Sequence, residues 1–363
     1  MKITFLIARA DTVGGAQVHV RDLAISLQQD GHQVTVITGK KGVYNEILKE
    51  KKVESIAIAS LQPQINPIQD FQSLNLIIKT IKKIQPDLVS THSSKTGILG
   101  RIACNILNVP CIFTAHGWSF TSGVPEPSRT IYQNIEKLTA PLARKIICVS
   151  DCDRSIALDV GMNSDRLITV HNGMKDIPVA NQNQKQKPVK VLMVARFGRQ
   201  KDHETIIRAF RDISDAELIL VGDGSGFAEM ESLVQQLNLA HKVKLLGFRK
   251  DVPEIMAQAQ IYALISHWEG LPRTIIEAMR GGLPVVASDV GGVKELVTDG
   301  ETGYIIPRQD RELLTQRIND LVQDEQLRLK MGQAGRKKYE SQFTFEQMYH
   351  KTLATYKQAI THH

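Results

Sequence analysis

Short apolar runs alternate with stretches of helical periodicity along the first half of the chain. The runs typical of buried strands are KITFLIA (2–8), QVTVIT (33–38), DLVST (87–91), PCIFTA (110–115) and KIICVS (145–150). Apolar positions recur at helical spacing between them, over 17–28 and near 70–84, 94–107 and 128–143. This alternation predicts parallel β-sheets covered by helices, and therefore an α/β fold.

The same alternation restarts in the second half, in VKVLMVA (189–195), AELILVG (216–222), KVKLLGF (242–248), IYALIS (261–266) and VVAS (285–288). From Asp310 onward the chain is charged and helical, with no strand candidate. The segment NQNQKQKP between the halves is polar and of low complexity, which indicates a linker. We therefore predict two doubly wound, Rossmann-like domains, with the chain divided into 1–180, a linker at 181–188, 189–343 and a final helical segment at 344–363.

The composition of the 363-residue chain, 42% hydrophobic and 23% charged, is typical of a soluble enzyme. No apolar run reaches eighteen residues, so we expect no transmembrane helix. The N-terminal MKITFLIARADTVGG leads straight into a glycine turn, as a first strand does, and a cytoplasmic location follows. The four cysteines lack C-x2-C spacing and the eleven histidines contain no H-E-x-x-H, so neither a disulfide nor a metal site is expected.

The net charge of +7 is concentrated in the first half, where residues 1–185 contain 21 Lys and Arg against 15 Asp and Glu. A basic half suits peripheral contact with an anionic membrane surface or a phosphate-bearing acceptor. The alternative is a surface kept soluble by lysines, and composition leaves both interpretations open. Nucleic acid is a weaker fit as a partner, because only 5% of residues are aromatic and none alternate with the lysines.

Two glutamates, Glu269 and Glu277, lie eight positions apart across a predicted strand-to-helix junction in SHWEGLPRTIIEAMRGG. The alternative interpretation of two glutamates on a loop and a helix is a pair of solvated surface side chains. Here, however, the helix N-terminus offers N–H groups and a partial positive charge that suit a phosphate. Glu269 precedes this terminus and Glu277 lies about one turn inside the helix. One carboxylate can therefore reach the sugar of a nucleotide sugar while the other accepts hydrogen bonds from ribose hydroxyls.

This segment resembles the E-x7-E signature of the retaining, nucleotide-sugar-dependent glycosyltransferases of family 4. The resemblance implies the GT-B fold, in which two Rossmann-like domains face each other across a central cleft. It implies that Glu269 is catalytic. It also implies a donor site that includes Gly270, Leu271, Pro272, Arg273, Thr274 and Glu277.

Two cations, Arg196 and Lys201 in VARFGRQKD, follow the first strand of the second domain. A departing nucleoside diphosphate carries negative charge, which a guanidinium and an ammonium can neutralise without a metal ion. Their R-x4-K spacing resembles the diphosphate site of the family, although Arg199 between them could substitute in part. The resemblance also assigns Phe248 to the border of the nucleotide base.

Gly14 and Gly15 lie between the first strand and the first helix, where glycines let the backbone approach a phosphate; the alternative is a purely structural turn. In the resembled family this loop touches both substrates, so Gly15 is assigned to the donor and Gly14 to the acceptor side. Many relatives carry Glu where this chain has Gln17.

His116 follows the strand at 110–115, where an imidazole can contact a sugar hydroxyl or relay a proton. A histidine at this place in the family contacts the donor sugar and is needed for turnover, so we predict that His116 is catalytic. His92, at another strand end, is a second candidate, on the acceptor side. Trp118 and Phe120 in the loop 117–127 are predicted to stack on the acceptor's sugar or acyl groups.

The sequence thus predicts a retaining, metal-independent glycosyltransferase without a cofactor. It would move a sugar from a nucleotide diphosphate donor, uridine-linked by our prediction, to a lipid-linked or glycan acceptor at the inner membrane face. Two alternatives remain: a nucleotide-sugar 2-epimerase of the same fold, which needs no acceptor, and a non-catalytic protein that binds sugar nucleotides. A dinucleotide oxidoreductase is disfavoured because no G-x-G-x-x-G follows the first strand.

Overall fold

The computed structural model describes residues 1–62, 64–121, 123–177 and 186–361. The chain divides into two compact units, which are described separately below. Unit 1 comprises Met1–Asn172 and Met348–His363, and unit 2 comprises Gly173–Gln347. Of the predicted linker, residues 181–185 lie outside the described residues.

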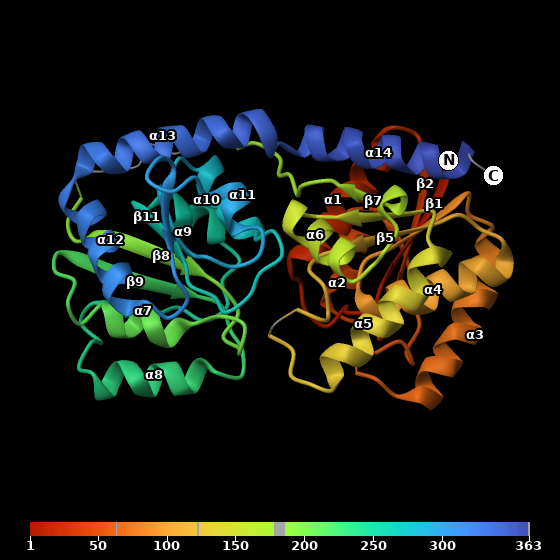
Figure 1. Cartoon of the computed structure of the whole chain (residues 1–363), viewed down its shortest axis with the longest axis horizontal. Helices are drawn as coiled ribbons and strands as arrows, with labels where there is room; N and C mark the ends of the chain where they lie inside the picture. The colour runs from red at the N-terminus through yellow and green to blue at the C-terminus, as the bar shows by residue number, and fades with distance from the viewer. Residues whose placement is uncertain (63, 122, 178–185, 362–363) are drawn as a thin grey trace. The chain divides into compact units, whose positions relative to one another are not determined.

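Unit 1 is built on a seven-stranded parallel sheet with the strand order β3-β2-β1-β4-β5-β6-β7. Figure 1 labels β1, β2, β5 and β7 of this sheet. Its strands are β1 (Lys2–Ile7), β2 (Gln33–Thr38), β3 (Glu54–Ala57), β4 (Leu88–Thr91), β5 (Cys111–Ala115), β6 (Lys145–Cys148) and β7 (Leu167–Thr169). Its helices are α1 (Gly15–Gln29), α2 (Val43–Glu50), α3 (Pro67–Ile84), α4 (Ser94–Leu107), α5 (Ser128–Thr139) and α6 (Asp151–Asp159), with short 3-10 turns at Ala140–Leu142 and Ser164–Arg166.

The last helix, α14 (Phe345–Thr361), packs on unit 1 over most of its length. The hydroxyl of Tyr349 donates a hydrogen bond to the Asp30 carboxylate at the end of α1. About two turns further along the same helix, the fully buried Tyr356 donates to the Ser90 hydroxyl in β4, at 2.8 Å. The chain therefore contributes its C-terminal segment to the same unit as its N-terminal strand.

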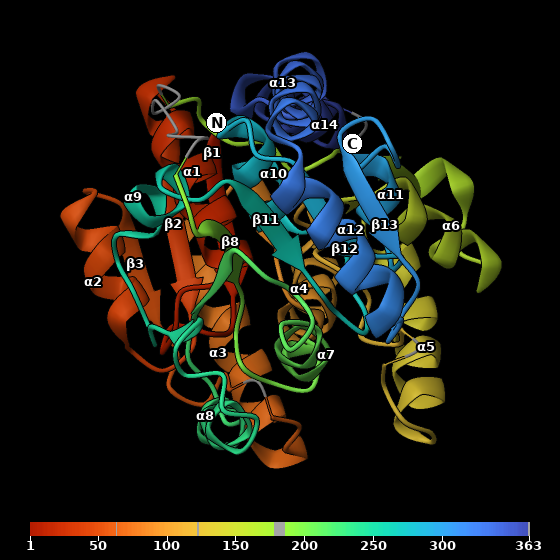
Figure 2. The same cartoon turned by 90° about the vertical axis from the view of Figure 1, so that its left-hand side faces the viewer.

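Unit 2 repeats the architecture with a six-stranded parallel sheet in the order β10-β9-β8-β11-β12-β13. Figure 2, in which this unit faces the viewer, shows β8, β11, β12 and β13 following one another across the sheet. Its strands are β8 (Val189–Val194), β9 (Ala216–Val221), β10 (Val243–Leu245), β11 (Ile261–Leu264), β12 (Val285–Ser288) and β13 (Gly303–Ile306). Its helices are α7 (His203–Ala209), α8 (Phe227–Gln236), α9 (Val252–Ala257), α10 (Arg273–Arg280), α11 (Val293–Leu296), α12 (Arg311–Gln323) and α13 (Glu325–Gln342).

The central strands form because their apolar side chains are covered on both faces of each sheet, as in β1, β4, β11 and β12, which are almost wholly buried. These are the strands that the apolar runs predict, and the α/β prediction is confirmed. Three strands without such a run, β3, β7 and β13, each lie at the edge of a sheet, where partial exposure removes the apolar signal. Among the described residues, no helix combines the length and the apolarity needed to span a bilayer.

Candidate active site

Most of the predicted functional residues of each unit follow strands at or next to the point where the strand order of its sheet reverses direction. In unit 2 the chain passes from β8 outward to β9 on one side and later to β11 on the other, so the reversal lies between β8 and β11. In unit 1 the equivalent point lies between β1 and β4. Open α/β sheets bind ligands beyond the carboxyl ends of their strands at such points. The loops after β8 and β11 carry Lys201 and Glu269, and those after β4 and β5 carry His92 and His116.

Lys201 and Glu269 form a largely buried ion pair in unit 2. Their loops are held together by a short backbone bridge between Lys201 and Ser266 and by the bond from the His267 amide to the Gln200 carbonyl. The Lys201 ammonium donates to Oε1 of Glu269, and the two side chains are only 14% and 6% exposed. The carboxylate also accepts from the Ser266 hydroxyl at 2.6 Å and from the Gln200 amide at 3.2 Å. Glu269 is therefore fixed in a single position by three donors.

A glycine on the neighbouring loop holds the Glu269 backbone in place. Gly291, after β12, has φ +53°, and a Cβ added there would lie 2.0 Å from the Glu269 carbonyl oxygen. The next amide, that of Gly292, donates to the Gly270 carbonyl at 2.8 Å. Only a residue without a side chain allows this close approach. Gly291 and Gly292 thus position the loop that carries Glu269.

Arg196 is exposed at the end of β8, and its loop is braced by a second glycine. Gly222, at φ +143°, lies so close that a Cβ would be 2.0 Å from the Ala195 carbonyl oxygen. Arg199 is also exposed, so the structure leaves it as accessible as Arg196. The next strand end carries Phe248, whose ring is largely exposed after Gly247.

The segment from Gly270 to Thr274 leads into α10, whose first residue is Arg273 and whose N-cap is Pro272. Leu271 and Arg273 are buried, while Thr274 and Glu277 are half-buried. The start of α10 therefore lies four residues after Glu269 in the chain. A helix N-terminus adds partial positive charge to the ammonium in this part of unit 2.

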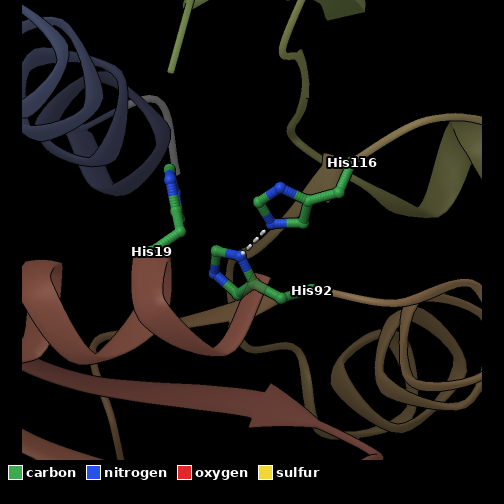
Figure 3. Close-up of side chains that lie close together, drawn as sticks. All are labelled: His19, His92 and His116. Atoms are coloured by element: carbon green, nitrogen blue, oxygen red, sulfur yellow. Dashed lines mark hydrogen bonds between the residues drawn. The ribbon is translucent and has the colours of Figure 1, made fainter. Parts of the chain in front are cut away.

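Three histidines come together in unit 1: His19 from α1, His92 after β4 and His116 after β5 (Figure 3). Nδ1 of His92 lies 3.1 Å from Nε2 of His116, within hydrogen-bond distance. Burial, together with the nearby His116, lowers the pKa of His92 well below its ordinary value, so His92 is neutral at physiological pH. Its other nitrogen, Nε2, lies 2.9 Å from the Ser90 hydroxyl, which accepts from Tyr356. A chain of four polar groups thus runs from α14 to His116.

Gly14 and Gly15 are exposed at the start of α1, with Gly14 as its N-cap. The buried Gln17 accepts from the Gly14 amide at 3.1 Å and donates to the Arg9 carbonyl at 3.1 Å. A carboxylate could accept the first of these hydrogen bonds but could not donate the second. Gln17 therefore has a structural role in shaping the glycine loop.

The prediction that Trp118 stacks on an acceptor is wrong. The Trp118 side chain is only 4% exposed, and its indole N–H donates to the Asp153 carbonyl at 2.7 Å. Its ring packs between Phe113 and Phe120 in the core of unit 1. The ring is covered by α6, which follows the next strand, so its faces are not offered to a ligand. Residue 122 of the same predicted loop lies outside the described residues.

Sequence reasoning missed His19, Gln200, Ser266 and Tyr356. Gln200 and Ser266 adjoin residues that were predicted, and their position at strand ends was the available signal. His19 and Tyr356 lie on helices, and nothing in their spacing indicates which distant residue they contact. Only the assembled unit brings them to the site.

Comparison with known proteins gives matches over nearly the whole chain. Residues 13–176 match the model of Glycosyltransferase Family 4, and residues 175–338 match that of Glycosyl transferases group 1. The UDP-Gal:alpha-D-GlcNAc-diphosphoundecaprenol alpha-1,3-galactosyltransferase of Escherichia coli is 30% identical over 316 residues, which cover 82% of this chain and 81% of that protein. This chain belongs to glycosyltransferase family 4. It is a nucleotide-sugar glycosyltransferase.

Further relatives of this glycosyltransferase agree with that assignment. The O-antigen biosynthesis glycosyltransferase WbnH of Escherichia coli is 28% identical and covers 83% of this chain and 88% of its own. Among solved structures, HepE of Anabaena in complex with UDP-glucose superposes with a TM-score of 0.85 at 23% identity, covering 99% of this chain and all of that one. Sucrose-phosphate synthase from Thermosynechococcus elongatus gives a TM-score of 0.84 at 22% identity, with 99% of this chain covered and 100% of that chain. The fold of this glycosyltransferase is GT-B.

Proposed function

We propose that this glycosyltransferase moves a sugar from a UDP-sugar to a lipid-linked or glycan acceptor, with retention of configuration and without a metal ion. The name of the Escherichia coli relative specifies UDP-galactose and a diphosphoundecaprenol-linked acceptor, and HepE was solved with UDP-glucose. The observation that carries the proposal for this chain is the largely buried ion pair of Lys201 with Glu269, of which Glu269 lies just before α10 in the chain.

The donor diphosphate is assigned to the cations of unit 2. A departing UDP gains negative charge, which the Lys201 ammonium, the exposed Arg196 and the N-terminus of α10 would neutralise. In the absence of a donor, Glu269 balances the Lys201 charge. When the diphosphate recruits Lys201, the Glu269 carboxylate becomes an acceptor for sugar hydroxyls, still held by Ser266 and Gln200. Glu277 is assigned to the ribose and the Phe248 segment to the uracil.

His116 is assigned to a sugar hydroxyl, with His92 as the group that orients its ring. Because Ser266 and Gln200 still hold Glu269 when Lys201 turns to the diphosphate, it is poorly placed to move onto an anomeric carbon as a nucleophile. We therefore assign attack by the acceptor on the same face from which UDP departs. In this mechanism the protein supplies orientation and charge stabilisation.

The test is a thermal-shift screen of nucleoside diphosphates and their sugars, followed by transfer assays with the ligand that binds. A ligand at a hundredfold its Kd stabilises the protein by about 2.7 kcal/mol. UDP should stabilise the protein more than GDP or ADP, and the α-linked product from an α-linked donor should form only when acceptor is present. An epimerised donor formed without acceptor would establish the epimerase instead, and binding without turnover would establish a non-catalytic sugar-nucleotide-binding protein.

We also propose that unit 1 contacts the anionic inner face of the membrane through α3. Ile68 and Phe71 on this helix are 73% and 67% exposed. They begin a solvent-facing stripe at helical spacing that continues with basic side chains. The stripe consists of Ile68, Phe71, Leu76, Lys79, Lys82 and Lys83. Apolar groups that enter the headgroup region, followed by lysines that attract anionic lipid, are typical of an interfacial helix.

A further inference from the structure

The three histidines of unit 1 are close enough to bind one ion together. One nitrogen each from His19, His92 and His116 lie within 4.8 Å of one another. The ring centroids of His19 and His116 are 4.9 Å apart, and those of His92 and His116 are 5.4 Å apart. Figure 3 shows the three rings arranged around a common space. His19 and His92 are buried, and His116 is half-buried, which leaves a route from solvent.

The spacing is close to that of a tetrahedral metal site. Zinc binds imidazole nitrogen at about 2.0–2.1 Å, which places two ligand nitrogens of a tetrahedron roughly 3.3 Å apart. The 3.1 Å between His92 Nδ1 and His116 Nε2 is close to this distance. The His19 nitrogen lies within 4.8 Å of the other two, so its ring must approach them by at most about 1.5 Å to complete the site. Water would take the fourth position.

The surroundings of His92 favour this arrangement. Its Nε2 is engaged by the Ser90 hydroxyl at 2.9 Å, so that Nδ1 faces the other two rings. Ser90 is in turn held by Tyr356 at 2.8 Å. Metal-bound histidines commonly have their second nitrogen fixed by such a partner, which sets the tautomer and the ring orientation. A set of three imidazoles without a carboxylate selects zinc, cobalt, nickel or copper over magnesium, calcium or manganese.

We propose that His19, His92 and His116 bind one divalent transition-metal ion, with Zn²⁺ as the best match, and that the bound ion inhibits sugar transfer. The ion takes Nε2 of His116, the nitrogen that His92 otherwise holds, and so withdraws the ring from the orientation in which it would contact the substrate. The inhibition rests on the role proposed for His116, whereas the binding rests on the geometry of the three rings alone. The site is distinct from the diphosphate site assigned to unit 2, so inhibition by zinc is compatible with catalysis that needs no metal.

The first experiment measures binding without activity. The full-length protein, stripped with chelator and dialysed, is titrated calorimetrically with Zn²⁺, and Co²⁺ is added separately to read coordination geometry from its visible absorption. Every protein carries His362→Ala and His363→Ala, which removes the histidines at the chain end. We expect one ion per chain and the intense absorption of tetrahedral cobalt. Absence of binding would overturn the proposal.

Single variants locate the ion. His19→Gln and His92→Gln should each weaken Zn²⁺ binding at least about tenfold. His171→Gln tests the competing candidate, because His171 lies in the same unit, 3.9 Å from the Asp151 carboxylate, and could itself help to bind an ion; it should leave the affinity unchanged. If a buried variant fails to fold, His116→Gln replaces it, since His116 is half-buried. Loss of binding in His171→Gln, with the triad variants unaffected, would overturn the assignment.

A third experiment, an inhibition assay, tests this inference separately from the proposed function. Zn²⁺ should inhibit transfer by the protein in which His19, His92 and His116 are intact, and chelator should reverse the inhibition. His19→Gln should shift the inhibitory concentration by the same factor as its binding constant. Binding at the three histidines without inhibition would support the metal site and overturn the role proposed for His116. Inhibition that His19→Gln does not shift would overturn the inhibitory mechanism.

Discussion

The ammonium of Lys201 donates a hydrogen bond to the carboxylate of Glu269, although 68 positions separate the two residues. The sequence predicts that Lys201 contacts the diphosphate and that Glu269 contacts the sugar, but it does not indicate that the two side chains contact each other. Their pairing means that each sets the electrostatic environment of the other. Truncating either one leaves a charge in a largely buried place, so alanine variants would mix a folding defect with a catalytic one.

Conservative variants should separate the two roles. Glu269→Gln keeps an oxygen that can accept from Lys201 and Ser266. It should lower kcat roughly a hundredfold or more, because the proposed mechanism places the charge of Glu269 near the anomeric centre, and it should change the Kd of UDP less than about threefold. Lys201→Met should weaken UDP binding about ten- to a hundredfold, through the loss of a charge-assisted hydrogen bond. Calorimetry with UDP and steady-state kinetics measure both effects. Full turnover in Glu269→Gln would remove Glu269 from the sugar site.

Gly291→Ala should disable the enzyme without touching any charged group. Its Cβ would lie 2.0 Å from the Glu269 carbonyl oxygen at a left-handed φ of +53°, so the loop that carries Glu269 must shift. We expect a fall in both Tm and kcat, with the catalytic loss exceeding about tenfold because a small displacement of a positioned group is enough. Gly281→Ala is the control, since its nearest neighbour is at 3.4 Å, and it should keep wild-type kcat. Equal activity of the two variants would contradict the positioning role of Gly291.

The stability of unit 2 should depend on His203 at acid pH. Burial, and then the nearby Lys201 ammonium, lower the pKa of His203 to about 4, and its ring stacks on Phe197 at 4.0 Å. In the unfolded chain the His203 imidazole takes up a proton near pH 6.5, whereas in the folded chain it does so only near pH 4. The contribution of His203 to the free energy of unfolding is therefore constant above about pH 6.5 and falls as the pH drops toward 4. The full loss approaches roughly 3 kcal/mol.

Urea unfolding at a series of pH values measures this dependence on His203. The His203→Gln variant should lose most of the slope between pH 6.5 and 4, because glutamine does not titrate. His241→Gln, at an exposed position in the same unit, should retain the slope. An unchanged slope in His203→Gln would place the acid sensitivity elsewhere.

Transfer should not require an added metal ion, because Lys201, Arg196 and the start of α10 are assigned to the diphosphate. Activity should survive excess EDTA, and magnesium or manganese added afterwards should not raise kcat. The assay compares initial rates before and after chelation, followed by dialysis. Complete loss with EDTA, restored by a divalent ion, would show that these groups do not suffice.

The stripe on α3 should direct binding to anionic vesicles. Replacing Ile68 and Phe71 with serine should weaken partitioning onto phosphatidylglycerol vesicles at least about tenfold, because it removes the apolar groups that would enter the headgroup region. Salt should weaken the wild-type interaction by screening the lysines. Leu329→Ser in unit 2 is the control for an exposed apolar residue elsewhere. Equal sedimentation with phosphatidylcholine vesicles would show that charge plays no part.

The sequence by itself determined the elements whose signal is local. The helix predicted at 94–107 is α4 with the same bounds, and the strand at 33–38 is β2, because a strand or helix covered by its neighbours must be apolar at the period of its own geometry. The same local reading found the strand-end loops with Arg196, Lys201, His116 and Glu269. In a parallel sheet the carboxyl ends of all strands lie at the same edge. The fold class alone therefore predicts that the proposed site residues of one domain lie along that edge.

Tertiary structure decided which of these residues meet and which are covered. The Lys201–Glu269 pair, the His19–His92–His116 cluster and the bond from Tyr356 to Ser90 each join segments that are distant in sequence. Trp118 lies in the core because the chain after β5 turns back under α6, which no local pattern records. The periodicity of apolar residues in a segment shows which of its faces is buried. The partner of each side chain depends on how several helices and strands pack together, which no single segment shows.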